Sequence, residues 1–182
     1  MIPTRTDEEL LAAHRAGDDG AFAELAGRHA DRMWGVAVRT LHDQDEAADA
    51  VQETLLAAHR AADRFRGDAS VRTWLHRILV NTCMDRLRDA RRRPTVPWPD
   101  HEMPAVRPDA VAELATRMAV SDALATLPDF QRVAIVLVDV QGFGVAEVAR
   151  ILDVPVGTVK SRCARGRTRL AVLLGHLRGE QW

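Results

Sequence analysis

A cluster of prolines divides this chain into two parts. Five of its eight prolines fall between Arg93 and Asp109, in the stretch RPTVPWPDHEMPAVRPD. Proline lacks a backbone N–H and restricts the residue before it, so neither a helix nor a strand can run through such a stretch. We therefore predict a moderately stiff linker over residues 94–110, between parts 1–93 and 111–182 that are each long enough for a small domain. The alternative is an ordered loop on a single domain.

Both parts have the periodicity of helices. Apolar residues recur at three- and four-residue spacing, which predicts a first helix near Leu10 and further helices over 21–41, 45–61 and 71–92. After the linker, the same spacing predicts helices over 111–126, 128–140, 145–152 and 156–177, with a break at QGFG, residues 141–144. No stretch alternates as a strand does. The predicted fold class is all-α, with two small helical domains joined by the Pro-rich linker.

Composition excludes several classes of protein. No apolar run approaches the ~18 residues that span a bilayer, and the N-terminal stretch is too acidic for a signal peptide, so we expect a cytoplasmic protein. Cys83 and Cys163 have no second ligand at metal-binding spacing, and we expect two buried thiols without metal or disulfide. The sequence has no HExxH motif and no Gly-rich phosphate loop. We therefore predict no enzyme, assign no catalytic residue and expect no cofactor.

One segment is strongly basic, although the formal net charge of the chain is −1. Between Pro155 and Arg178 there are six Lys or Arg residues and no Asp or Glu. Together with the residues before it, this segment has the pattern of a helix-turn-helix over residues 145–165. The turn carries Asp153, one of the few non-glycine residue types that tolerate a left-handed backbone.

The second helix of this motif separates into two faces. Val159, Cys163, Gly166 and Leu170 recur at three or four residues and predict a buried stripe. The other face combines cations with small residues, as does a helix that enters the major groove of DNA. Its members are Lys160, Ser161, Ala164 and Arg165. The overall neutral charge confines attraction for DNA to this local surface.

Stretches in both parts resemble one known family. VPVGTVKSRCARGRTRL, residues 154–170, and LATLPDFQRVAIVLVDVQGFGVAEVARIL, residues 124–152, resemble domain 4 of the extracytoplasmic-function (group 4) sigma factors of bacterial RNA polymerase. DQDEAADAVQETLLAAHR, residues 43–60, and FRGDASVRTWLHRILVNTCMDRLRDARRR, residues 65–93, resemble domain 2 of the same family. The resemblance covers nearly the whole chain, in family order, and in detail is most similar to the SigM-like actinobacterial group.

The resemblance implies an alternative sigma factor, which binds core RNA polymerase and directs promoter-specific initiation. Sigma domain 2 would occupy residues 1–93 and sigma domain 4 residues 111–182. The implied contacts to −35 duplex DNA are Thr158, Lys160, Ser161, Arg162, Ala164 and Arg165. The implied contacts to −10 single-stranded DNA are Phe65, Arg66, Gly67, Asp68, Asn81, Asp85 and Arg88. The implied polymerase-binding residues are Asp49, Gln52 and Glu53.

The resemblance also implies partners: core RNA polymerase, promoter DNA and an anti-sigma factor, which in this family is often membrane-anchored. The residue pattern supports parts of this interpretation. Asn81 and Asp85 lie four residues apart on one helix face, and Asn can read a base edge with a donor and an acceptor together. Trp74 shares the face of Ile78, which favours core packing over stacking on a base, whereas His76 and Arg77 are expected to be exposed. Phosphate contacts are expected from Arg86, Arg88, Arg91, Arg92 and Arg93.

Two other functions remain open on the residues alone. The first is a helix-turn-helix transcriptional regulator that acts without binding core polymerase, and that would bind palindromic half-sites as a dimer. The second is an enzyme, which the scattered histidines do not favour.

Overall fold

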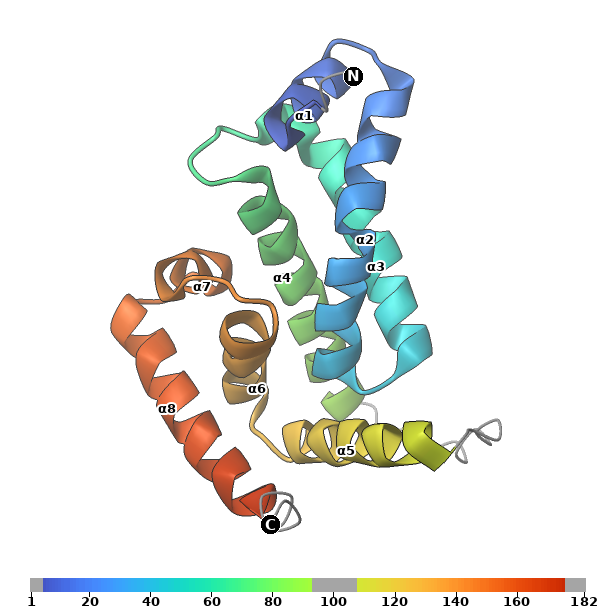
Figure 1. The fold of residues 1–182 in the computed structure, drawn as a ribbon. Helices are drawn as coiled ribbons and strands as arrows, with labels where there is room; N and C mark the ends of the chain where they lie inside the picture. The colour runs from blue at the N-terminus through green and yellow to red at the C-terminus, as the bar shows by residue number, and fades with distance from the viewer. Residues whose placement is uncertain (1–4, 93–107, 176–182) are drawn as a thin grey trace.

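The computed structural model describes residues 5–92 and 108–175, and within them every regular element is helical, which confirms the all-α prediction. Figure 1 shows α4 in the middle of the molecule, with α1 to α3 on one side and α6 to α8 on the other. The elements are α1 (Asp7–Arg15), α2 (Asp19–Leu41), α3 (Gln44–Ala61), the 3-10 turn η1 (Ala62–Arg64), α4 (Val71–Arg92), α5 (Pro108–Ala125), α6 (Asp129–Ile135), the π-helical turn η2 (Val136–Val140), α7 (Val145–Leu152) and α8 (Val156–Leu173).

The ends of these helices follow from local side-chain chemistry. The Asp18 carboxylate accepts hydrogen bonds from the first backbone N–H groups of α2, and the Asp43 carboxylate accepts one from Glu46 at the start of α3. Such N-caps satisfy donors that the helix itself leaves unpaired. The predicted linker lies mostly outside the described residues, and α5 begins at Pro108, inside the segment predicted as linker.

The helix predicted over 128–140 has two parts. Its α-helical part ends at Ile135, and the chain continues as a π-helical turn in which the Gln141 N–H donates to the Val136 carbonyl at 2.9 Å. Its start is fixed by Arg132, whose guanidinium donates to the Asp129 carboxylate at 2.6 Å and to the Ala125 carbonyl at 3.2 Å. Arg132 thus ties the end of α5 to the beginning of α6.

Helices α6 and α8 pack closely at Gly166. A Cβ atom added there would lie 2.8 Å from Ile135 Cγ1, closer than side chains approach in folded proteins. Ile135 is itself only 3% exposed and has little room to move. Gly166 therefore permits the close approach of the two helices.

We expect Gly166→Ala to lower the free energy of unfolding. Overpacking a buried contact costs about 1–3 kcal/mol, which exceeds the gain in helix propensity of up to about 1 kcal/mol. Gly157→Ala, in the same helix but with no atom within 4 Å of the added Cβ, is the matched control and is expected to be neutral or stabilising. Urea unfolding followed by circular dichroism measures both, and equal stability of the two variants would contradict the close contact.

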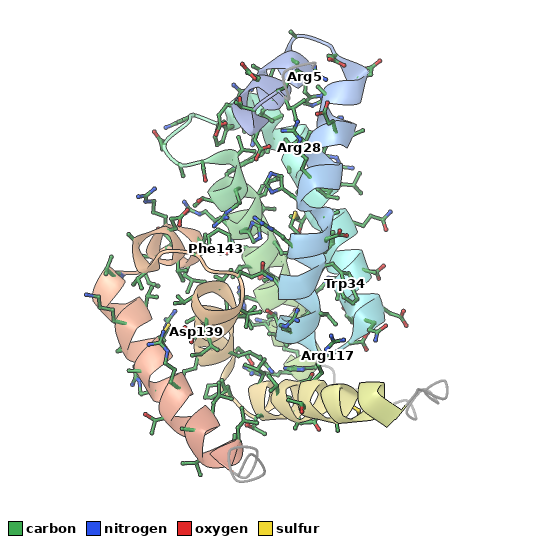
Figure 2. The ribbon with its side chains drawn as sticks, in the orientation of Figure 1. Arg5, Arg28, Trp34, Arg117, Asp139 and Phe143 are labelled. Atoms are coloured by element: carbon green, nitrogen blue, oxygen red, sulfur yellow. The ribbon has the colours of Figure 1, made fainter. Side chains whose placement is uncertain are left out.

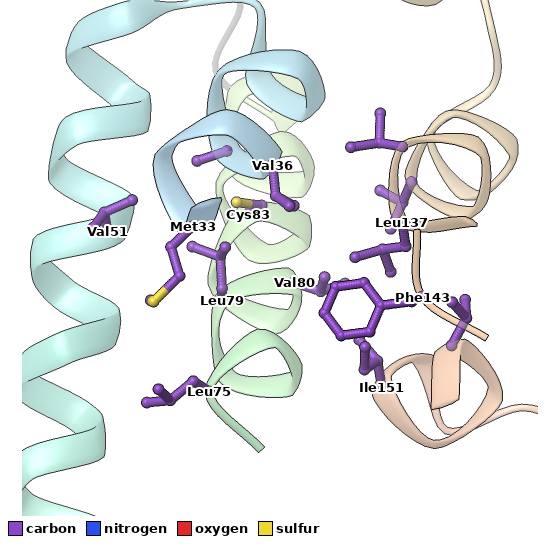
Figure 3. Close-up of a cluster of buried hydrophobic side chains, with 14 of the residues drawn as sticks. Met33, Val36, Val51, Leu75, Leu79, Val80, Cys83, Leu137, Phe143 and Ile151 are labelled. Carbon is purple, nitrogen blue, oxygen red and sulfur yellow. The ribbon is translucent and has the colours of Figure 1, made fainter. Parts of the chain in front are cut away.

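The two halves of the chain share one continuous apolar core. Phe143, from the turn between η2 and α7, is only 4% exposed and reaches across to α4. Its ring lies 4.8 Å from the His76 ring, and the Arg72 guanidinium carbon lies 3.9 Å from its centroid. Figure 3 shows the Phe143 ring beside Val80 of α4 and Ile151 of α7. Ion pairs Arg77–Asp153 and Arg91–Asp129 add polar contacts across the same interface.

His76 is fully buried, so the prediction that it is exposed is wrong; Arg77 is exposed as predicted. The periodicity of α4 alone cannot reveal that a second layer, from the C-terminal half, covers the face that carries His76. The Nδ1 atom of His76 lies 2.8 Å from the Arg72 carbonyl, and its Nε2 atom has no partner among the described residues. Burial lowers the pKa of His76 to about 4, so the ring is neutral at pH 7.

We expect the buried His76 to make the protein acid-sensitive. The unfolded chain takes up a proton near pH 6.5, whereas the folded chain does so only near pH 4. Stability is therefore lost as the pH falls through this window, by up to about 3 kcal/mol. Urea unfolding at pH 7.5 and pH 5 should show this slope, and His76→Gln should flatten it. Identical slopes for both proteins would contradict a neutral buried ring.

Candidate nucleic-acid and polymerase interface

The turn between α7 and α8 has the geometry that the sequence predicts. Asp153 ends α7 with φ 52° and ψ 50°, in the left-handed region. The Val154 N–H then donates to the Ala149 carbonyl at 3.0 Å, which closes the turn. Val148 and Ile151 of α7 and Val159 of α8 are buried where the two helices meet. The helix-turn-helix prediction is therefore confirmed as a structure.

Helix α8 presents the predicted polar face to solvent. The residues of its inner side, Val159, Cys163 and Gly166, are buried, and Leu170 is partly buried. Burial raises the pKa of the Cys163 thiol, and Cys83 is likewise a buried free thiol whose pKa is raised to about 12. The exposed residues of the predicted −35 set are Lys160, Ser161, Ala164 and Arg165.

The other two members of the −35 set differ from these four. Thr158 is half-buried in the first turn of α8. Arg162 is also half-buried, with its guanidinium carbon 4.7 Å from the centroid of the Phe130 ring, so it lies against α6. Sequence spacing cannot show this contact, because Phe130 comes from a helix more than 30 residues earlier. Nearby, Arg167 donates two hydrogen bonds to Asp139 at 3.0 and 2.7 Å.

A second polar region begins at the loop of residues 65–70, between η1 and α4. Gly67 adopts a positive φ of 77°, and the Ser70 hydroxyl accepts from the Thr73 N–H at the start of α4. The loop borders a cavity of about 350 Å³. Its aromatic wall is the pair Phe65–Trp74, with ring centroids 5.3 Å apart. The cations around it are Arg64, Arg66, Arg77 and Arg150.

Trp74 is placed both to pack in the core and to offer a stacking surface. It packs against the apolar core and lines this cavity with its half-exposed side. The loop residues Arg66, Gly67 and Asp68 are exposed, whereas Phe65 is half-buried. Aromatic surface flanked by cations is the chemistry that holds an unpaired nucleobase and its phosphate.

A stripe of polar residues continues from this cavity along α4. Arg77, Asn81, Asp85 and Arg88 follow Trp74 at three- or four-residue spacing and are exposed, so they lie on one helix face. Arg88 pairs with Asp85 at 2.7 Å. Beside the stripe, a smaller cavity of about 290 Å³ separates α4 from the C-terminal half, lined by Val80, Asn81, Met84, Arg88, Phe130, Val133 and Leu152.

Helix α3 carries the predicted polymerase-binding set on its outer face. Asp49, Gln52 and Glu53 are exposed, while Ala47, Ala50, Val51, Thr54 and Ala58 are buried. The Arg86 guanidinium of α4 pairs with Glu46 at 2.5 Å and with Glu53 at 3.1 Å. Arg86 was expected to contact phosphate. It is instead engaged with α3, because the two helices lie side by side and bring the opposite charges together.

An apolar groove of about 540 Å³, which the sequence pattern did not predict, lies between α2 and α3. Trp34 is 42% exposed and Leu56 51% exposed along it, and Val51 and Leu55 also line it. Figure 2 shows Trp34 at the side of the molecule formed by α2 and α3. The sequence could have indicated this groove, because Trp34 and Leu56 are large apolar residues that fall outside the core-facing stripes of their helices. Gln52 lies at the edge of this groove, so the polar set and the apolar groove form one surface.

Both halves of the chain match known protein families. Residues 25–93 match the family model for Sigma-70 region 2, and residues 117–170 match that for Sigma-70, region 4. The chain is 51% identical over 173 residues to the ECF RNA polymerase sigma factor SigM of Mycobacterium tuberculosis, covering 95% of this chain and 87% of that protein. It is 34% identical to the ECF RNA polymerase sigma-E factor of Escherichia coli, over 92% of this chain and 93% of that one. The chain therefore belongs to the extracytoplasmic-function sigma factors of the sigma-70 family.

The fold of this chain is also similar to solved structures, one of which is a named sigma factor. The structure of CnrH in complex with the cytosolic domain of CnrY is similar with a TM-score of 0.71 and 31% identity, over 93% of this chain and 97% of that one. The sigma factor RpoE of Bartonella quintana, in complex with the anti-sigma factor NepR, is similar with a TM-score of 0.70 and 26% identity, over 86% of this chain and 98% of that one.

None of the helices in the described part of the chain combines the length and the apolar character that crossing a bilayer requires. Over the same residues, no group of three or more His, Cys, Asp or Glu side chains is placed to hold a metal ion.

Proposed function

We propose that this chain is an alternative sigma factor, which binds core RNA polymerase and directs initiation at promoters with defined −35 and −10 elements. The observation that carries the proposal is the presence of two distinct DNA-type surfaces on one chain. One is the basic face of α8 in a helix-turn-helix, and the other is the aromatic and cationic cavity that continues as the polar stripe of α4. An ordinary helix-turn-helix regulator needs only the first.

The α8 surface suits duplex DNA. A helix in the major groove places cations near phosphates and base edges, and its small residues allow close approach. Lys160 and Arg165 supply the cations, while Ser161 and Ala164 lie between them on the exposed face. We assign −35 recognition to this face, with Thr158 and Arg162 at its inner border.

The loop and α4 suit a single strand. A base leaves the duplex at a cost of a few kcal/mol, which a pocket can offset by stacking and hydrogen bonding. The Phe65–Trp74 pair offers the stacking surface, and Asn81 offers a donor and an acceptor to a base edge. Arg66 and Arg88 are exposed cations for the strand's phosphates. We assign −10 recognition to these residues together with Gly67, Asp68 and Asp85.

The outer face of α3 suits a basic partner. Asp49, Gln52 and Glu53 present carboxylates and an amide beside the apolar groove of Trp34 and Leu56. Such a mixed surface offers both charge complementarity and buried apolar area. We assign it to docking on core polymerase in the cytoplasm, with sigma domain 2 at residues 1–93 and domain 4 at 111–182. The polymerase then supplies the chemistry, and this chain is not itself an enzyme.

An anti-sigma factor is the further partner that we propose. The similar sigma factor RpoE was solved in complex with the anti-sigma factor NepR, and the likeness extends over both halves of this chain. A partner that covers the α3 surface would prevent docking on the polymerase.

Binding to purified core polymerase tests this function. The labelled chain should co-migrate with core polymerase, and Asp49→Arg should weaken the complex at least about tenfold, because it places a cation in the acidic surface. The control is Glu8→Arg, an equal charge change at an exposed position of α1. A chain that binds duplex DNA but not core polymerase would instead be a regulator of the helix-turn-helix class.

A further inference from the structure

Arg15, the last residue of α1, is bonded to the chain segment that leads into the loop of residues 65–70. Its Nε and Nη2 atoms donate to the Ala62 carbonyl at 2.8 and 2.5 Å. The same Nη2 donates to the Phe65 carbonyl at 2.6 Å. The guanidinium carbon also lies 5.9 Å from the centroid of the Phe65 ring. One side chain therefore holds two carbonyl groups about 50 residues further along the chain.

The location of these carbonyls explains why a cation is favourable there. Helix α3 ends at Ala61, and the 3-10 turn η1 follows at once. The last carbonyls of a helix lack partners within it and carry its partial negative charge. The Ala62 carbonyl accepts one hydrogen bond from the Phe65 N–H at 3.2 Å, and Arg15 adds further donors to it and extends its fork to the Phe65 carbonyl, where the loop begins. A lysine ammonium is a point charge and does not reproduce this planar fork.

The loop is fixed at both ends, and Arg15 provides the first of these fixed points. At the far end, the Ser70 hydroxyl accepts from the Thr73 N–H and lies 2.9 Å from the Thr73 hydroxyl. Between them, the residues are exposed except for Phe65 and Ala69, and Gly67 has a positive φ. The position of the Phe65 ring, which forms a wall of the loop cavity against Trp74, thus depends on the carbonyl that Arg15 holds.

We propose that Arg15 is a positioning residue for base capture at the −10 element. It acts through the Phe65 backbone and sets the shape of the pocket without touching DNA. This inference rests on the proposed function, in which the loop captures an unpaired base. Helix α1 lies outside residues 25–93, so the match to Sigma-70 region 2 does not assign Arg15 a role.

The test is transcription by the holoenzyme from a template library that carries random sequence upstream of a fixed transcribed region. Sequencing the transcribed templates gives the base preference at each promoter position. We expect Arg15→Gln to reduce the preference at one −10 position by about tenfold, the order of one lost base contact, while the −35 preference stays unchanged. Arg15→Lys should restore it only in part. Arg32→Gln is the matched control, because Arg32 is exposed on α2 and makes no hydrogen bond or ion pair with another described residue.

Three results would overturn the proposal. If Arg15→Gln and Arg15→Lys lower the melting temperature but leave every base preference unchanged, Arg15 only tethers α1. If transcription falls equally on all templates and the salt dependence of DNA binding weakens by about one charge, Arg15 contacts phosphate directly. If the unmodified protein enriches no spaced pair of elements, the proposed function fails and this inference falls with it.

Discussion

Replacing Lys160 by Glu is expected to reduce promoter-dependent transcription at least about tenfold, because a cation in the major groove becomes an anion facing phosphates. Lys160 is exposed on the outer face of α8, one position after the buried Val159, so its side chain does not support the core. The loss should therefore appear in DNA binding and not in stability. Electrophoretic mobility shift with promoter duplex, beside urea unfolding, separates these two effects.

Arg169→Glu provides the control for Lys160→Glu. Arg169 is exposed on the same helix, nine residues and about two and a half turns after Lys160, and it is not among the predicted −35 contacts. Both variants change the net charge of the chain equally. If they reduced transcription equally, the effect would come from overall charge, and the assignment of the Lys160 face to −35 DNA would be wrong.

Replacing Phe143 by Ala is expected to separate the two halves of the protein. Truncating a buried Phe costs about 3–5 kcal/mol, and the contact with Arg72 is lost as well. Among the ion pairs across the interface, Arg77–Asp153 joins two exposed side chains and contributes little. In the pair Arg91–Asp129, the Asp129 carboxylate is already paired with Arg132 within the C-terminal half. A loss of this size lowers the equilibrium constant for docking of the two halves by more than about a hundredfold.

Small-angle scattering measures this change directly. A compact chain of this length has a radius of gyration of about 16 Å, and we expect the Phe143→Ala value to exceed that of the unmodified protein by several ångströms. Far-ultraviolet circular dichroism should show unchanged helix content, since Phe143 lies in the turn between η2 and α7 and belongs to no helix. Val140→Ala, at an exposed position just before the same turn, should leave the radius unchanged. An unchanged radius for Phe143→Ala would mean that Phe143 does not hold the halves together.

Much of the fold is visible in the sequence because its signals are local. Helix α4 and helix α7 begin and end where periodicity places them, and Asp153 takes the left-handed turn position predicted for it. The buried stripe of α8 follows in the same way, because a three- to four-residue spacing fixes which side of a helix faces inward.

What the sequence does not reveal comes from contacts between distant segments. His76 is buried by Phe143, 67 positions later, and Arg86 is neutralised by two glutamates of α3. Arg162 is surrounded in the sequence by basic and polar residues, which predicts an exposed side chain, yet it lies against Phe130. In each case the partner sits on another helix, whose position depends on the packing of the whole chain.

We propose that this one chain reads two spaced promoter elements for core polymerase. Run-off transcription with purified core RNA polymerase on sheared genomic DNA of the host, with and without this protein, tests it most directly. We predict transcripts that depend on the protein, whose start sites share a −35 and a −10 element, and which are lost with Lys160→Glu or Asn81→Ala. If no such transcripts appear while the protein still binds duplex DNA, the chain does not act as a sigma factor on that polymerase.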